Sequence, residues 1–157
     1  MQAYVQAKLG GTETWVEIPE EGWPEDWITN GPPCERPCCR LIQALYGHPD
    51  SGTFWEKHAD KALKKVGFKP IAESWSSCYF NDSNGMYLVL YVDDFLMSGP
   101  EENMEKAWAD IAAVINIEDP GPIGLYLGCV HEEGAVEMDD GRKIRTMTFN
   151  QESFFRD

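Results

Sequence analysis

The sequence predicts an α+β domain in which two helices pack against an antiparallel sheet. Two segments, 51–66 and 101–114, carry apolar residues at helical spacing, and the almost wholly apolar run 86–97 lies between them. A polar tip interrupts that run, as in a β-hairpin. With 157 residues, of which 43% are hydrophobic, the chain is long enough to form one core.

The N-terminal region predicts a short strand followed by a long loop. Trp15–Ile18 alternates apolar and polar residues and then meets Pro19. The segment Glu20–Pro37 is rich in proline and glycine, so we expect a loop over the surface, held by Trp23 and Trp27.

Each of the two predicted helices has one apolar stripe. Asp50 or Ser51 can cap the first helix, and Gly67 can end it. Its stripe consists of Trp55, Ala59, Ala62, Leu63 and Val66. The second helix starts at Glu101, after Pro100, and runs to about Val114. Its stripe consists of Met104, Trp108, Ile111, Ala112 and Ile115.

The remaining apolar segments predict strands. Ser77–Phe80, a turn at Asn81–Gly85 and the hairpin Met86–Met97 supply the surface on which both helices can pack. Further on, Leu125–His131 is expected to be one strand.

The C-terminal segment predicts one more strand, Thr146–Phe149, after a polar connection at Glu132–Lys143. Asn150 is expected to cap a helix formed by Gln151–Asp157, which is too short to be stable by itself.

Charge and composition exclude several classes of protein. Thirteen Lys and Arg against 27 Asp and Glu give a net charge of -14, which argues against tight nucleic-acid binding by this chain alone. No apolar stretch is long enough to span a membrane and no signal peptide is recognisable, so we expect an intracellular protein that is not secreted. The odd number of cysteines, five, favours reduced thiols.

Asp93 and Asp94 form the most informative pair of residues in the chain. They follow an apolar strand, where an unpaired charge is costly, so they are expected at the tip of the hairpin. A divalent cation could neutralise both carboxylates there. The alternative, an ordinary solvated turn, is equally compatible with these two residues alone.

Several ordered segments resemble the reverse transcriptase domain of copia-type retrotransposon polyproteins. The most specific are Cys39–Gly47, with the sequence Cys-Arg-Leu-Ile-Gln-Ala-Leu-Tyr-Gly, followed by Ser51, Gly52 and Trp55. The others are Ala3–Leu9 with Thr14–Pro19, Tyr91-Val92-Asp93-Asp94, Leu125-Tyr126-Leu127-Gly128 and Thr148–Gln151. The resemblance covers nearly the whole chain.

The resemblance implies the palm of a right-hand polymerase, with the Tyr91–Asp94 hairpin at its centre. The family's reaction is RNA-directed DNA synthesis, in which two Mg²⁺ ions assist attack of a primer hydroxyl on an incoming nucleotide. By resemblance, Asp93 is the principal metal ligand and Asp94 its catalytic neighbour. Primer-template nucleic acid and deoxynucleoside triphosphates are the implied partners of the full-length protein.

Four further residues acquire expected roles from the resemblance. Tyr91 and Val92 are expected to shape the floor beneath the primer end. Ser51 and Gly52 match a helix start that lies near the incoming nucleotide and template in this family. Asp50 departs from the family, which usually has Gln at its position, and a charge there would repel phosphate.

Other departures lead us to expect a truncated palm domain at 1–157. The family's first catalytic Asp lies four residues before the position of Ala3, which places it, with the fingers, ahead of Met1. The thumb and ribonuclease H parts would follow Asp157. We therefore expect weak Mg²⁺ binding and negligible polymerase activity from the isolated chain, and an exposed sheet edge that could allow self-association.

Two alternatives stay open. The chain could be a non-catalytic binding or assembly module derived from a palm. It could also be an unrelated metal-binding fold in which Asp82 or Glu101 joins the Asp93-Asp94 pair, although that would leave the other matching segments unexplained.

Overall fold

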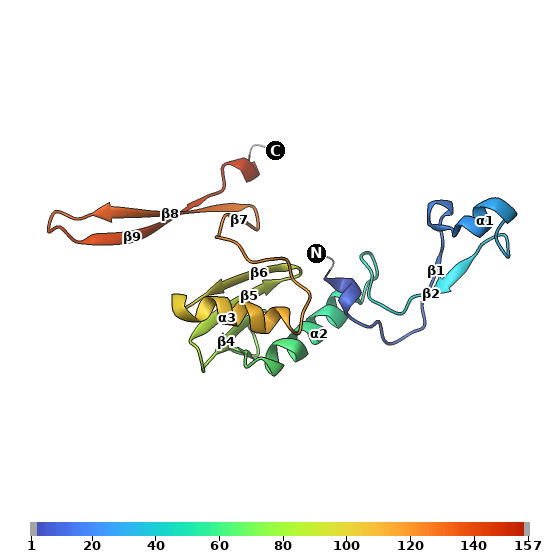
Figure 1. Ribbon diagram of the computed structural model, residues 1–157, viewed down its shortest axis with the longest axis horizontal. Coiled ribbons are helices and arrows are strands. Elements are labelled where there is room, and N and C mark those ends of the chain that lie inside the picture. The colour runs from blue at the N-terminus through green and yellow to red at the C-terminus, as the bar shows by residue number, and fades with distance from the viewer. Residues whose placement is uncertain (1–2, 156–157) are drawn as a thin grey trace.

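The structure, a computed structural model, describes residues 3–155, which combine helices with three antiparallel sheets (Figure 1). This confirms the α+β class. The helices are α1 (Glu25–Asn30), α2 (Ser51–Lys65) and α3 (Glu101–Ala112), with 3-10 turns at Tyr4–Gln6, Glu20–Gly22 and Ser153–Phe155. The strands are β1 (Trp15–Glu17), β2 (Cys38–Arg40), β3 (Lys69–Pro70), β4 (Cys78–Asn81), β5 (Met86–Tyr91), β6 (Asp94–Ser98), β7 (Leu125–Tyr126), β8 (Cys129–Glu137) and β9 (Lys143–Asn150).

A central body consists of the sheet β3-β4-β5-β6 and the helices α2 and α3. Side chains of β5 alternate strictly, with Met86, Leu88 and Leu90 buried and the residues between them exposed. One face of the sheet is therefore apolar, and it shares a single core with both helices. The opposite face is exposed at β5. The predicted 86–97 hairpin is present as β5 and β6.

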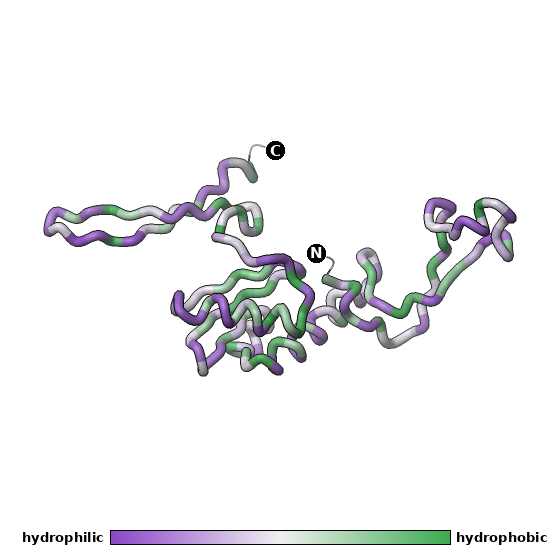
Figure 2. The backbone as a smooth tube through the Cα atoms, viewed as in Figure 1, coloured by the Kyte–Doolittle hydropathy of each residue, from purple (hydrophilic) through white to green (hydrophobic). Residues whose placement is uncertain are grey.

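The helices bury the faces that their spacing predicts, with small shifts. In α2 the residues Trp55, Ala59 and Leu63 are at most 1% exposed. Asp50 is the N-cap residue but makes no side-chain capping hydrogen bond. In α3, Ala107 and Ile111 are buried, whereas Ala112 of the expected stripe is exposed. Apolar segments accordingly gather in the body (Figure 2).

The N-terminal arm, residues 11–41, extends away from the body as β1, α1 and β2 (Figure 1). The predicted strand is confirmed as β1, which pairs with β2, a strand that the sequence did not predict. The expectation of an unbroken loop at Glu20–Pro37 is wrong, because residues 25–30 form α1. Trp23 does hold this region, since its indole N–H donates to the carbonyl of Ile18 at 2.9 Å.

The C-terminal arm, residues 125–155, contains β7, β8 and β9. The expectation that 125–131 is one strand is wrong. Leu127 (φ 49°) and Gly128 (φ 76°) are both left-handed and form a tight turn between β7 and β8. The expected connection at Glu132–Lys143 is mostly strand as well, because β8 and β9 pair over their whole length up to the turn at 138–142.

The expected C-terminal helix is a single 3-10 turn within the described residues. Asn150 acts as predicted at its start, because its side-chain oxygen accepts a hydrogen bond from the amide of Glu152 at 2.9 Å. Residues 156–157 of the expected helix lie outside the described residues.

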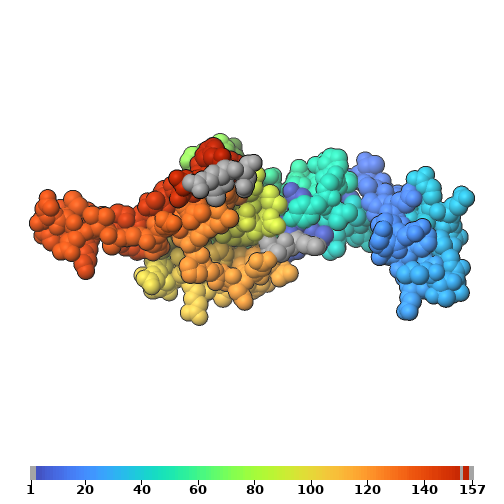
Figure 3. All heavy atoms as spheres, turned by 90° about the horizontal axis from the view of Figure 1, so that it is seen from above, coloured from blue at the N-terminus to red at the C-terminus, as the bar shows by residue number. Residues whose placement is uncertain are grey.

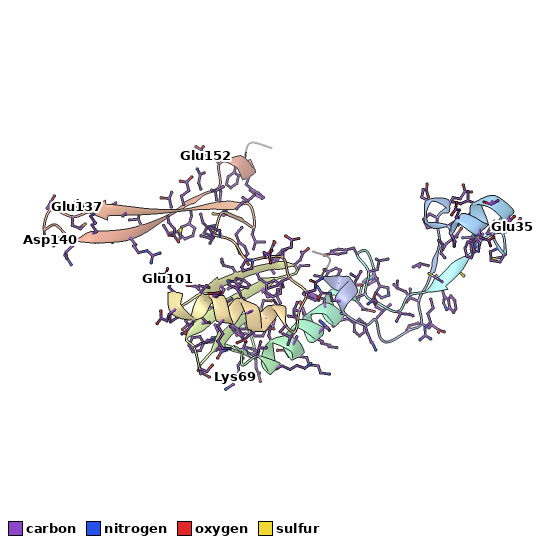
Figure 4. The ribbon with its side chains drawn as sticks, in the orientation of Figure 1. Glu35, Lys69, Glu101, Glu137, Asp140 and Glu152 are labelled. Carbon is purple, nitrogen blue, oxygen red and sulfur yellow. The ribbon has the colours of Figure 1, made fainter. Side chains whose placement is uncertain are left out.

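The two arms give the molecule an elongated shape, with the body between them (Figure 3). Acidic side chains occur on all three parts, including Glu35 in the N-terminal arm, Glu101 at the start of α3 and Glu137 and Asp140 at the far end of the C-terminal arm (Figure 4). Within residues 3–155, no helix is both long and apolar enough to cross a membrane.

Candidate active site at the tip of the β5–β6 hairpin

The tip of the hairpin has a strained backbone. Tyr91 pairs with Asp94, so Val92 and Asp93 are the two central residues of the turn. Among the described non-glycine residues only Val92 and Leu127 have positive φ, and the φ of Val92 is 55°. A positive φ at the first central residue alone is the pattern of a type II′ turn, which normally places glycine there. Holding a β-branched residue in this conformation costs on the order of 1–3 kcal/mol, so other contacts must stabilise the turn.

Trp55 of α2 supplies the shortest of these contacts. Its indole N–H donates a hydrogen bond to the carbonyl oxygen of Val92 at 2.6 Å. Trp55 is 1% exposed and belongs to the apolar core. A buried indole N–H needs an acceptor, so this bond both satisfies Trp55 and fixes the strained turn against the helix.

Tyr46 provides a second contact, to a carboxylate. Its hydroxyl donates to Oδ2 of Asp93 at 3.3 Å. The ring of Tyr46 stacks on Tyr4, with centroids 4.3 Å apart. Burial, the negative charge of Asp93 and the hydrogen bond raise the pKa of Tyr46, so the phenol stays a neutral donor around pH 7.

Ser51 stabilises the segment next to Tyr46 through the backbone of Leu45. Its hydroxyl donates to the carbonyl of Leu45 at 2.7 Å and accepts from the amide of Leu45 at 2.9 Å. Ser51 is fully buried, and both hydrogen bonds stay within this segment. These two bonds tie the loop that precedes α2 to the start of the helix, and they position the neighbouring Tyr46.

The two carboxylates lie in different surroundings. Asp93 is half-buried at the tip beside Tyr46, whereas Asp94 is exposed on β6. Burial, and after it the negative charge of Asp94, raise the pKa of Tyr126 in β7, which indicates that these two side chains are close. Within the described part of the chain neither carboxylate has an ion-pair partner.

A cavity of about 700 Å³ lies beside the tip, between α2 and the 70–79 segment. Three residues predicted to bind substrate line it: Gly52, Tyr91 and Val92. Ser51, the fourth, does not. The structure therefore brings most of the predicted residues to one region and gives Ser51 a position inside the packed core.

No role at the site was expected from the sequence for Trp55, Tyr46 or Tyr4, although all three lie in segments that resemble the family. Trp55 carried one signal, because a tryptophan in an apolar stripe needs an acceptor for its N–H. Nothing in the sequence identified Val92 as that acceptor, since the bond joins residues 37 positions apart. The contact of Tyr46 with Asp93 spans 47 positions and had no local signal.

The donor set at the tip is small. Two adjacent carboxylates offer hard oxygen ligands, which suit Mg²⁺, Mn²⁺ or Ca²⁺. Over residues 3–155 no group of three or more His, Cys, Asp or Glu side chains is placed to hold a metal ion. A cation at the tip would therefore take its remaining ligands from water or from a bound phosphate, as Mg²⁺ commonly does.

Comparisons with known proteins identify the family. Residues 3–147 match the family described as "Reverse transcriptase (RNA-dependent DNA polymerase)". A putative transposon Ty5-1 protein of Saccharomyces cerevisiae is 26% identical over 90 residues, which cover 56% of this chain and 29% of that protein. No solved structure matches the chain. The chain thus belongs to the reverse transcriptase family.

Proposed function

We propose that the chain provides the palm of a copia-type retrotransposon reverse transcriptase, with Asp93 and Asp94 at its catalytic tip. One observation carries this proposal: two carboxylates without ion-pair partners stand on a strained turn that Trp55 and Tyr46 hold in place. Strained, externally fixed turns with uncompensated charge are typical of functional sites. Within a palm, such a turn would display the acids at the primer end.

The residues at the tip fit a divalent cation of the hard type. Asp93 would be the principal ligand and Asp94 its neighbour, because both offer carboxylate oxygens that no cationic side chain of the described residues occupies. When bound there, Mg²⁺ would stabilise the charge that develops on the attacking and leaving oxygens of nucleotidyl transfer.

The protein's own side chains would position the reactants. Trp55 fixes the carbonyl of Val92, and Tyr46 orients one oxygen of Asp93. Tyr91, which is 58% exposed, and Val92 would form the floor under the primer end. Gly52, at the start of α2, would lie near the incoming nucleotide, and Ser51 would contribute by holding the loop of Tyr46.

We expect the isolated chain to bind Mg²⁺ weakly and to synthesise almost no DNA. Two adjacent carboxylates are a sparse donor set for a pair of metal ions. The net charge of -14 also repels a phosphate backbone, and acidic side chains occur on every part of the molecule (Figure 4).

A chimera tests the proposed function. Residues 3–155 would replace the corresponding segment of an active copia-type reverse transcriptase, and primer extension on an RNA template would be measured with Mg²⁺. We expect extension that Asp93→Ala abolishes and that Glu105→Gln, an exposed change on α3, leaves intact. A folded chimera whose activity is the same with and without Asp93 would contradict the proposal.

Primer extension by the chain itself tests the expectation of inactivity. We expect no product with Mg²⁺ or Mn²⁺. Product formation that Asp93→Ala abolishes would show that residues 1–157 suffice for catalysis, and it would overturn this expectation while supporting the polymerase function.

A second candidate function, a non-catalytic assembly module, is favoured by the edge of the central sheet. In the described residues β6 pairs with β5 alone, so its outer edge has free backbone donors and acceptors. Another copy of the chain could pair there.

Two substitutions separate edge pairing from association through the sheet face. Leu96 lies on β6 and pairs with Val89 of β5, so both side chains point to the same outer face. If copies associate through the edge, Leu96→Lys reduces the dimer fraction in sedimentation experiments much more than Val89→Lys does. A monomer at all concentrations would argue against this function.

A further inference from the structure

The cavity beside the hairpin has an apolar wall and an acidic rim. Aromatic side chains of Tyr4, Trp55, Tyr79 and Tyr91 line it. A volume of about 700 Å³ is within the range of sites that hold small organic molecules. Flat aromatic walls favour a ligand with an apolar body, and their π faces also attract cations.

Charged residues around the cavity leave an excess of negative charge. Glu56, Asp60 and Glu73 line it together with one cation, Lys57. Asp60 already pairs with Lys64 at 2.7 Å, but Glu56 and Glu73 have no ion-pair partner among the described residues. Three carboxylates against Lys57 and Lys64 leave a net charge of -1. A ligand with a single positive charge would balance it.

One hydroxyl of the cavity wall, that of Tyr79, makes no hydrogen bond to any described residue. Tyr79 is 3% exposed as a residue, but its oxygen is not among the buried atoms that lack a partner, so the hydroxyl opens to the cavity. Burial and the nearby charges of Asp60 and Glu56 raise the pKa of Tyr79 to about 12, so the hydroxyl is neutral and lies close to these carboxylates. A hydroxyl that opens to a cavity is available to hydrogen-bond a polar atom of a ligand.

We propose that this cavity binds a small organic cation with a flat apolar body, such as an arylalkylammonium ion. Its body would pack against Tyr91, which is the most exposed aromatic side chain of the wall, and its ammonium group would lie near Glu56 and Glu73. The cavity shares Gly52, Tyr91 and Val92 with the proposed substrate site, but binding of the cation requires neither the carboxylate of Asp93 nor a metal, so it can be tested separately from polymerase activity.

Binding at this place would act on the hairpin tip. Tyr91 and Val92 line the same cavity, and Trp55 connects its wall to the carbonyl of Val92 at 2.6 Å. A ligand that presses on these residues would therefore change the surroundings of the neighbouring Asp93 amide. The cavity provides a route by which a small molecule could alter the tip without occupying it.

A titration of the isotope-labelled full chain by nuclear magnetic resonance tests the proposal. The probes are phenylpropylammonium, the corresponding alcohol and the corresponding carboxylate, which have similar shapes and different charges. We expect the ammonium ion to bind with a Kd on the order of 1 mM. It should bind about fivefold more tightly than the alcohol. The signals that move should include the Trp55 indole N–H and the amides of Val92 and Asp93.

Variants with opposite expected effects make the result decisive. Glu56→Gln and Glu73→Gln should each weaken ammonium binding about threefold to fivefold, whereas Lys57→Gln should strengthen it. Glu105→Gln on α3 is the matched control and should change nothing. Equal binding of the ammonium ion and the alcohol would overturn the proposal, as would signal changes located away from Trp55. Insensitivity to all three cavity variants would also overturn it.

Discussion

Two hairpins of this molecule each carry adjacent aspartates at the tip, and they differ in everything that surrounds those acids. Asp93-Asp94 follows β5, a strand whose alternate side chains are buried under α2 and α3. Asp139-Asp140 lies in the turn between β8 and β9, strands that are exposed over most of their length. Both pairs would look alike in a search for acidic motifs.

The difference lies in how the carboxylates are held and neutralised. Asp140 accepts from the guanidinium of Arg142 at 2.7 Å, two positions away, so its charge is compensated within the turn. Asp93 has no such cation in the described residues and is held instead by Tyr46. Long-range packing thus separates a candidate metal site from a solvated turn, although the local sequence is similar.

The largest expected effect is on the free energy of unfolding, and it differs between the strands of the two hairpins. Leu88→Ala removes a core side chain that is 1% exposed, and it should lower the free energy of unfolding by about 2–5 kcal/mol. Ile144→Ala in β9 removes a side chain that is 43% exposed and should change it by less than about 0.5 kcal/mol. Urea denaturation followed by circular dichroism measures both. Similar losses for the two variants would show that the β8–β9 hairpin is as integral to folding as the body.

The next effect concerns the bond that fixes the strained turn. Trp55→Phe removes the hydrogen bond to Val92 and some core volume, so we expect a loss of at least about 1–2 kcal/mol and altered amide signals at Val92 and Asp93. Trp23→Phe is the matched control, because it removes the same type of bond, to Ile18, in the N-terminal arm. It should alter signals in residues 11–41 alone. Unchanged tip signals in the Trp55 variant would refute the role given to this bond.

Alkaline pH should test the buried phenol of the body. The pKa of Tyr79 is raised to about 12 in the folded protein from an ordinary value of 10.0. Its contribution to stability is therefore fully present below pH 10 and is lost as the pH rises from about 10 toward 12. Tyr79→Phe should be nearly neutral at pH 7, because no protein hydrogen bond is lost, and should lessen the fall in stability at high pH. Identical pH profiles would contradict the raised pKa of this phenol.

The smallest expected effect is at Tyr46. Its hydrogen bond to Asp93 is long, at 3.3 Å, and Tyr46 is 49% exposed, so Tyr46→Phe should cost less than about 0.5 kcal/mol. The change should still move the amide signal of Asp93. Tyr87→Phe, at an exposed position in the middle of β5, should leave that signal in place. An equal shift of the Asp93 signal in both variants would show that Tyr46 has no specific contact with Asp93.

Local patterns in the sequence predicted the two helices and the hairpin of the body, whereas the two-residue strand β3 was not predicted. The stripe through Trp55, Ala59 and Leu63 predicts α2 because helical spacing places these side chains on one face, and a core then covers them. The apolar run with acids at its tip predicts β5 and β6 for a similar reason. In both cases burial imposes a periodic pattern on the sequence.

The arms have less buried surface and were predicted less well. The β8–β9 strands are exposed, so pairing such as Glu133 with Met147 needs no apolar alternation and leaves little signal in the sequence. Leu127 occupies a left-handed position where Asn or Gly is usual, so the β7–β8 turn could not be recognised from the sequence. At the site the acids were recognisable from the sequence. The side chains that hold the tip, Trp55 and Tyr46, lie 37 and 47 positions before the residues that they contact, so no local pattern predicts these contacts.

We propose that Asp93-Asp94 binds a divalent cation and that Asp139-Asp140 does not. Titration of the chain with Mn²⁺ tests it most directly, because the paramagnetic ion broadens amide signals near its binding site. We predict that residues 92–95 broaden at concentrations that leave residues 138–142 sharp, and that Asp93→Ala abolishes this while Asp140→Ala does not. Equal broadening at both tips, or broadening at 92–95 that survives Asp93→Ala, would contradict a cation site at Asp93-Asp94.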